Sequence, residues 1–86
     1  MTMKIKEGFI LQDVAGDTVA LPVEGELDRM IRLNETGKFL WQQLEQETDR
    51  QALIQALLGA YEVDEETAAL CVDRFVEELQ KHELLA

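Results

Sequence analysis

The spacing of apolar residues changes near Leu33, and this change constrains the fold more than any other feature of the sequence. Before Leu33 the apolar runs are short and are separated by turn residues, which is typical of strands. After Asn34 apolar residues recur every three or four positions, which is typical of amphipathic helices. Strands followed by helices predict an α+β domain in which helices cover one face of a small sheet.

Three short strands are predicted in the first half of the chain. They cover residues 9–14, 18–21 and 30–33. Residues 15–17 form a three-residue connection whose glycine is available for positive φ, which suits a hairpin. Pro22 cannot donate a hydrogen bond to a neighbouring strand, so we expect it to mark the end of the second strand. Short connections predict an antiparallel meander whose third strand lies at an edge.

Three helices are predicted after the strands, each opened by a side chain that can accept hydrogen bonds from the first turn. Asn34 caps the first helix, a capping-box pattern beginning at Thr48 caps the second, and Asp64 caps the third. The expected apolar faces are, in chain order, Gly37, Leu40, Trp41 and Leu44; Leu53, Ile54, Leu57, Leu58 and Tyr61; and Ala68, Cys71, Val72, Phe75, Val76 and Leu79. With 86 residues the chain has room for one domain, and residues 1–86 are interpreted as one. The apolar pair at residues 84–85 should pack on this domain.

The charge balance disfavours several classes of partner. The chain carries 18 acidic and 8 basic residues, for a net charge of −10, and residues 34–86 account for −8 of it. Such a surface repels phosphate groups, so nucleic acid and anionic membranes are not expected as partners. No apolar run is long enough to span a membrane. A single cysteine suits a reducing compartment, and we expect a cytoplasmic protein.

Residues that could carry catalysis or hold a metal are scarce. Cys71 and His82 are each the only residue of their type, and no glycine-rich nucleotide loop or calcium loop is present. Neighbouring acidic pairs point to different sides of their helices, which does not suit an acid–base pair. The chain contains no serine, which excludes a serine nucleophile and a phosphopantetheine attachment point. We therefore expect no enzymatic activity, no cofactor and no metal site.

A binding surface is the remaining candidate for a functional site. The third strand and the third helix carry several of the few basic residues, and a groove between them would accept an added peptide strand. The alternative is that these arginines only protect an exposed edge from aggregation. The candidate peptide-binding residues are Arg29, Met30, Ile31, Arg32, Leu33, Leu70, Cys71, Arg74, Glu78 and Lys81.

The segment from Met30 to Trp41 resembles the signature of the PqqD family, which is a short apolar strand, then L-N-x-T-[GA], then an apolar helix containing Trp or Leu. Further matches are residues 61–64 before the last helix and the apolar ending at residues 79–85. The matching residues Leu33, Asn34, Thr36 and Gly37 are interpreted as determinants of the fold. His82 stands near the position where many members carry a glycine.

This resemblance implies a winged-helix-like fold and the function of a RiPP precursor-peptide recognition element. Such domains bind the leader of a ribosomally made peptide as a strand beside the third strand, packed against the third helix. They present the peptide to a modifying enzyme, often a radical SAM protein. The resemblance therefore implies a leader peptide and such an enzyme as partners.

Two other functions stay open. The first is a winged-helix DNA-binding domain, which the acidity of the segment Asp64–Lys81 disfavours. The second is a structural subunit that binds the modifying enzyme but no leader. An exposed edge strand also permits a homodimer.

Overall fold

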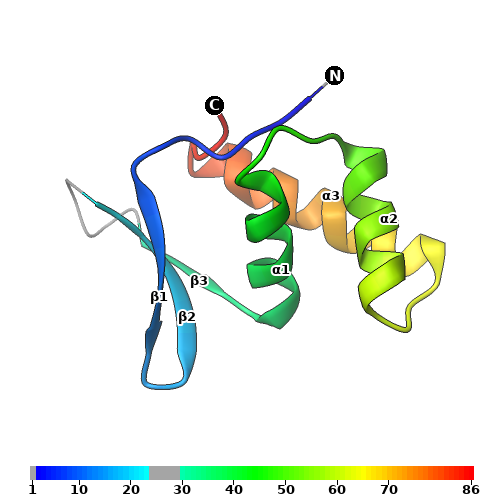
Figure 1. The fold of residues 1–86 in the computed structure, drawn as a ribbon, viewed down its shortest axis with the longest axis horizontal. Coiled ribbons are helices and arrows are strands. Elements are labelled where there is room, and N and C mark those ends of the chain that lie inside the picture. The colour runs from blue at the N-terminus through cyan, green and yellow to red at the C-terminus, as the bar shows by residue number, and fades with distance from the viewer. Residues whose placement is uncertain (1, 24–29) are drawn as a thin grey trace.

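The computed structural model describes residues 2–23 and 30–86. Its elements are, in order, β1 (Phe9–Val14), β2 (Asp17–Pro22), β3 (Ile31–Leu33), α1 (Glu35–Leu44), α2 (Arg50–Ala60) and α3 (Glu65–Lys81). The three strands form one antiparallel sheet in the order β1-β2-β3, and all three helices lie on the same side of the β1–β2 hairpin (Figure 1). The α+β fold with three strands followed by three helices is confirmed.

The strands follow the sequence prediction closely, with differences at the hairpin turn and at the start of β3. The hairpin connection has two residues, because Ala15 (φ 53°) and Gly16 (φ 89°) both take the left-handed conformation, and Asp17 therefore pairs with Val14. Met30 precedes β3 instead of lying within it, and Arg29 lies outside the described residues. Pro22 ends β2 as predicted.

The helix caps are confirmed for α1 and α3 and shifted by one residue for α2. The side-chain oxygens of Asn34 and Asp64 accept hydrogen bonds from the N–H groups of Gly37 and Thr67, respectively. The cap of α2 is Asp49, not Thr48. The backbone of Thr48 instead exchanges two hydrogen bonds with Met3, which holds Thr48 in extended conformation and lets the helix begin one residue later.

The core lies between the helices and the inner face of the sheet. The buried helix residues are those predicted: Gly37, Leu40, Trp41 and Leu44 from α1, Leu53, Ile54 and Leu57 from α2, and Ala68, Val72 and Leu79 from α3. The sheet adds Ala20 and Leu33, and Phe9 packs edge-to-face on Trp41 with ring centroids 6.1 Å apart. Leu58, Tyr61, Cys71, Phe75 and Val76 pack against this core while partly exposed.

The chain end after α3 docks on the domain, as the sequence predicts. The N–H of Leu84 donates to the carbonyl of Leu79 (2.8 Å) and that of Glu83 to the carbonyl of Gln80 (3.1 Å), the two bonds of a Schellman motif. Leu84 is fully buried, and Leu85 pairs with Ile5. The left-handed residue of this motif is Glu83 (φ 59°), so position 83, and not position 82, is the one where the backbone favours a glycine.

Candidate functional site: a groove between β3 and α3

β3 has one face that packs toward the helices and one edge that no other strand of the described residues covers. Its register with β2 places Ile31 and Leu33 opposite Ala20 and Thr18 on the inner face of the sheet, and Arg32 opposite Val19 on the outer face. The sheet ends at β3, since no strand in the described residues pairs with its second edge. Backbone donors and acceptors on that edge can therefore receive an added strand.

Two adjoining hollows of about 310 and 160 Å³ separate β3 and the start of α1 from α3. Asn34, Gly37, Phe75 and Glu78 border both hollows, so the two lie side by side, and together they are called the groove below. The larger hollow is completed by Thr36, Leu40, Cys71 and Arg74, and the smaller by Ile31, Arg32, Leu33 and Leu79. The groove is therefore mainly apolar, with polar groups at its rim.

Gly37 lets the side chains of Asn34 and Phe75 pack closely on α1 at the border of the groove. A Cβ at this position would lie 3.1 Å from the Oδ1 atom of Asn34 and 3.4 Å from Cε1 of Phe75. The same Oδ1 atom accepts the capping hydrogen bond from the Gly37 N–H at 2.7 Å. The absence of a side chain thus serves the helix cap and the close packing of Phe75, which borders both hollows.

The charged side chains at the rim of the groove differ in whether another side chain already pairs with them. Arg74 borders the larger hollow, is exposed, and takes part in no ion pair within the described residues. Glu78 borders both hollows, and its Oε2 atom lies 3.9 Å from Nε2 of His82. Arg32 borders the smaller hollow, but its guanidinium is bound to Asp17 on the outer face of the sheet. Arg74 is therefore the cation available to a ligand in the groove.

The structure brings six of the ten predicted peptide-binding residues to the groove, namely Ile31, Arg32, Leu33, Cys71, Arg74 and Glu78. Met30 and Leu70 are each half exposed and border neither hollow, and Lys81 is exposed at the end of α3, also away from both. Arg29 lies outside the described residues.

Several groove residues were not predicted from the sequence: Asn34, Thr36, Gly37, Leu40, Phe75 and Leu79. Each of them is explained in the sequence by a structural role as a cap, a close contact or a core residue. The sequence therefore gives no separate sign that the same residue also borders the groove. The signal that could have found them is position, because residues 34–37 join β3 to α1 and must lie beside any ligand of the β3 edge.

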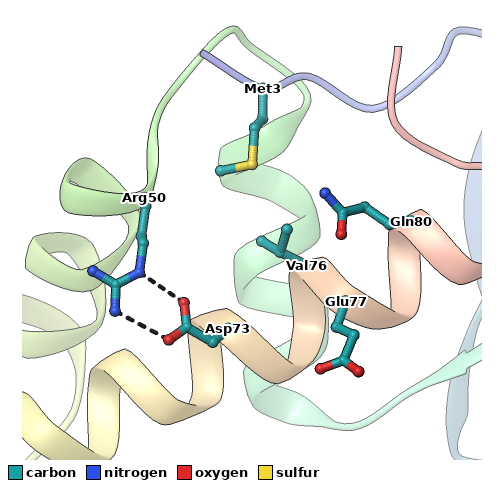
Figure 2. Close-up of a pocket in the computed structure, with 6 residues that line it drawn as sticks. All are labelled: Met3, Arg50, Asp73, Val76, Glu77 and Gln80. Atoms are coloured by element: carbon teal, nitrogen blue, oxygen red, sulfur yellow. Dashed lines mark hydrogen bonds and ion pairs between the residues drawn. The ribbon is translucent and has the colours of Figure 1, made fainter. Parts of the chain in front are cut away.

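A further hollow of about 380 Å³ lies between the N-terminal segment, the start of α2 and α3. Figure 2 shows Met3 and Val76 beside an ion pair in which Nε and Nη2 of Arg50 donate to the Asp73 carboxylate, at 2.7 and 3.0 Å. This pairing raises the pKa of Arg50 and lowers the pKa of Asp73, chiefly through the side-chain hydrogen bond. At 100° per residue, the α3 residues of this hollow lie nearly opposite those of the groove. Its charges already satisfy each other.

Other kinds of site find little support in the described part of the chain. Residues 2–23 and 30–86 contain no group of three or more His, Cys, Asp or Glu side chains placed to hold a metal ion. No helix among them is long and apolar enough to cross a membrane. Cys71, the single cysteine of the chain, is partly buried and borders the groove.

Comparisons with known proteins give a family match and a similar solved structure. The family described as Coenzyme PQQ synthesis protein D (PqqD) matches residues 17–85. Among solved structures, the chain resembles one titled "TbiB1 in Complex with the TbiA(beta) Leader Peptide", with a TM-score of 0.75 and 25% sequence identity over 96% of this chain and 94% of that chain. No curated protein sequence matches the chain significantly.

Proposed function

The chain belongs to the PqqD family, and from this premise we propose that it is a non-catalytic adaptor that binds the leader of a ribosomally made precursor peptide. The observation that carries the proposal is the open groove between the β3 edge and α3. The solved structure that the fold resembles was determined with a leader peptide bound, which supports the same class of ligand.

The bound leader would add a strand to β3. Alternate side chains of a strand point to one face, so every second leader residue would enter the groove. The groove walls are apolar at Ile31, Leu40 and Phe75, and Arg74 is the available cation. We therefore expect a leader with alternating apolar residues and an acidic side chain that reaches Arg74.

Side-chain burial must supply most of the affinity. β3 has only three residues, so an added strand forms few backbone hydrogen bonds with it. Each such bond contributes a net ~1 kcal/mol, whereas a dissociation constant of about 1 μM requires about 8 kcal/mol. The rest has to come from apolar surface in the hollows, at about 25 cal/mol per Å² removed from water.

The proposed adaptor acts by bringing the leader to a separate modifying enzyme, which we expect to be a radical SAM protein acting in the cytoplasm. Holding the substrate on the adaptor raises its local concentration and fixes its orientation at that enzyme. No chemical step is assigned to the adaptor itself.

The test is a titration of the ¹⁵N-labelled chain with a synthetic leader of the precursor peptide encoded beside its gene. Saturable binding should shift the amide signals of β3 and of Cys71, Arg74 and Glu78. The opposite side of α3, marked by Asp73 and Gln80, is the internal control and should stay unchanged. Absence of saturable binding would refute the leader-binding function, and shifts centred on the Arg50–Asp73 hollow would refute the site.

A further inference from the structure

The outer face of the sheet carries several exposed apolar side chains, although it also holds Gln12 and the Asp17–Arg32 ion pair, and Val19 at its centre is buried. The strand register places Ile10 and Val14 of β1 on this face together with Val19 and Leu21 of β2. Ile10 is 49% exposed and Val14 is 51% exposed. The helices lie against the other face, which contributes Phe9, Leu11, Ala20, Ile31 and Leu33 to the core (Figure 1).

The same face continues beyond the ends of the strands. Val23 donates its N–H to the carbonyl of Gly8 and so extends the register of β2, which puts its 60% exposed side chain on the outer face. Met30 alternates with Ile31 in the same sense and is 50% exposed. Four of the six exposed large apolar side chains of the described residues therefore gather here, which is typical of an interaction surface.

The charges around this face indicate the chemistry of its partner. Of the two acidic residues in the hairpin, the register places Asp17 on this face and Asp13 on the helix side, where Thr18 donates a hydrogen bond to it. Arg32, which shares the outer face, is paired with Asp17. A partner with an apolar centre would complement the exposed side chains, and basic residues around that centre would complement the net charge of −10. A second copy of this chain would bring the same acids and a further charge of −10.

The position of the face beside β3 suggests which protein binds there. A leader strand added to β3 extends the sheet, and the leader side chains that do not enter the groove then lie on the outer face. A protein seated on this face would contact the hairpin and the bound leader at once, without competing for the groove. This is the arrangement that a modifying enzyme needs in order to receive a leader-bound substrate.

We infer that the outer face of the sheet, centred on Ile10 and Val14, is the docking surface for the modifying enzyme, through an apolar patch bordered by lysine or arginine. This inference rests on the proposed function. It assigns to the two faces of the sheet edge two different partners: the leader on the helix side and the enzyme on the opposite side.

The experiment compares the full chain with the double variant Ile10→Lys/Val14→Lys. Val63→Lys is the matched control, since Val63 is a 37% exposed apolar residue in the connection between α2 and α3. The probes are the synthetic leader and the purified modifying enzyme encoded beside the gene, each titrated by calorimetry. Circular dichroism and the unfolding midpoint establish that each variant is folded.

We expect the double variant to bind the enzyme at least tenfold more weakly while its leader affinity stays within about twofold, and Val63→Lys to change neither. The leader should also raise the affinity of the wild-type chain for the enzyme. Unchanged enzyme affinity in a folded double variant would overturn the inference, as would a wild-type dimer that the double variant dissociates. Loss of leader binding by the wild-type chain would instead refute the proposed function.

Discussion

The guanidinium of Arg32 is bound to the carboxylate of Asp17, with Nη2 and Oδ2 2.6 Å apart, on the face of the sheet that points away from α3. Both side chains are more than half exposed, so the pair adds little to stability. The ion pair does, however, hold the Arg32 guanidinium on the side of the sheet away from the groove. From the sequence alone, Arg32 and Arg74 are equivalent candidates for binding an acidic leader. Of these two, Arg32 is ion-paired in the structure, and Arg74 has no ion pair within the described residues.

The first prediction concerns these two arginines. Arg74→Glu should weaken leader binding about tenfold, which corresponds to about 1.4 kcal/mol, because it replaces the available cation with an anion. Arg32→Glu is the matched control with the same charge change and should weaken binding by less than about threefold. Calorimetric titration at low and high salt checks both variants. An equal loss in the two would contradict the assignment of the charge to Arg74.

The second prediction concerns the width of the groove. Gly37→Ala places a methyl group 3.4 Å from Phe75 Cε1 and 3.1 Å from Asn34 Oδ1. The helix propensity gained from alanine, about 1 kcal/mol, offsets the crowding of the cap, so stability should change little. Leader affinity should fall about fivefold to tenfold because the methyl group displaces the ring of Phe75, which borders both hollows.

Gly59→Ala is the control for the second prediction, because a Cβ at Gly59 of α2 meets no atom within 4 Å. It should stabilise the helix and leave leader binding unchanged. Titration and urea unfolding measure the two quantities separately. Unaltered leader binding by Gly37→Ala would mean that the leader does not depend on the placement of Phe75.

The third prediction concerns the hairpin turn. Ala15 holds a φ of 53°, a conformation that costs an L-residue with a Cβ about 1 kcal/mol or more. Ala15→Gly should therefore raise the free energy of unfolding by about 0.5 kcal/mol, the relief of strain being partly offset by the entropy of glycine. Gly16→Ala should lower it, because φ at Gly16 is 89°. Urea unfolding followed by the fluorescence of buried Trp41 provides the measurement, and a less stable Ala15→Gly would contradict the strain argument.

The fourth prediction concerns acid stability. The hydrogen bond from Arg50 lowers the pKa of Asp73 below its ordinary value of 3.8, so the pair stabilises the fold at neutral pH and is lost as pH falls below that value. Asp73→Asn should therefore be less stable than the wild-type chain at pH 6, and the difference should shrink below about pH 4. Urea midpoints across this range test it. A difference that grows on acidification would contradict the sign.

Much of the fold could be predicted because the residues that begin and end each helix or strand lie close to it in the sequence. The apolar spacing of α1 and the cap at Asn34 are both visible within a dozen residues, and both are confirmed. The predicted cap of α2 was wrong by one residue, because the start of this helix depends on Met3, which is distant in sequence and pairs with Thr48. Local patterns contain no information about such a contact.

The candidate site was predicted less completely for the same reason. The sequence places Arg32 on β3, but it cannot show that the charge is taken by Asp17 across the sheet. It places Phe75 on an apolar stripe, but it cannot show that the side chain lines a groove opposite Gly37. Element and face follow from periodicity, whereas the partner of a side chain follows from tertiary packing.

The fifth prediction concerns the turn after α3, where the resemblance to the PqqD family suggests a glycine near His82. The residue with positive φ is Glu83 (φ 59°), and His82 has an ordinary φ of −93°. Glu83→Gly should raise the free energy of unfolding by about 0.5–1 kcal/mol, because glycine adopts the left-handed conformation without a Cβ penalty.

His82→Gly is the matched control for this turn and should lower stability, because it adds flexibility to the unfolded chain and relieves no strain. Urea unfolding of both variants distinguishes the two positions. A more stable His82→Gly together with a less stable Glu83→Gly would show that the Schellman motif closes one residue earlier. Since that motif buries Leu84 against the core, an earlier closure would also move Leu85 out of register with Ile5.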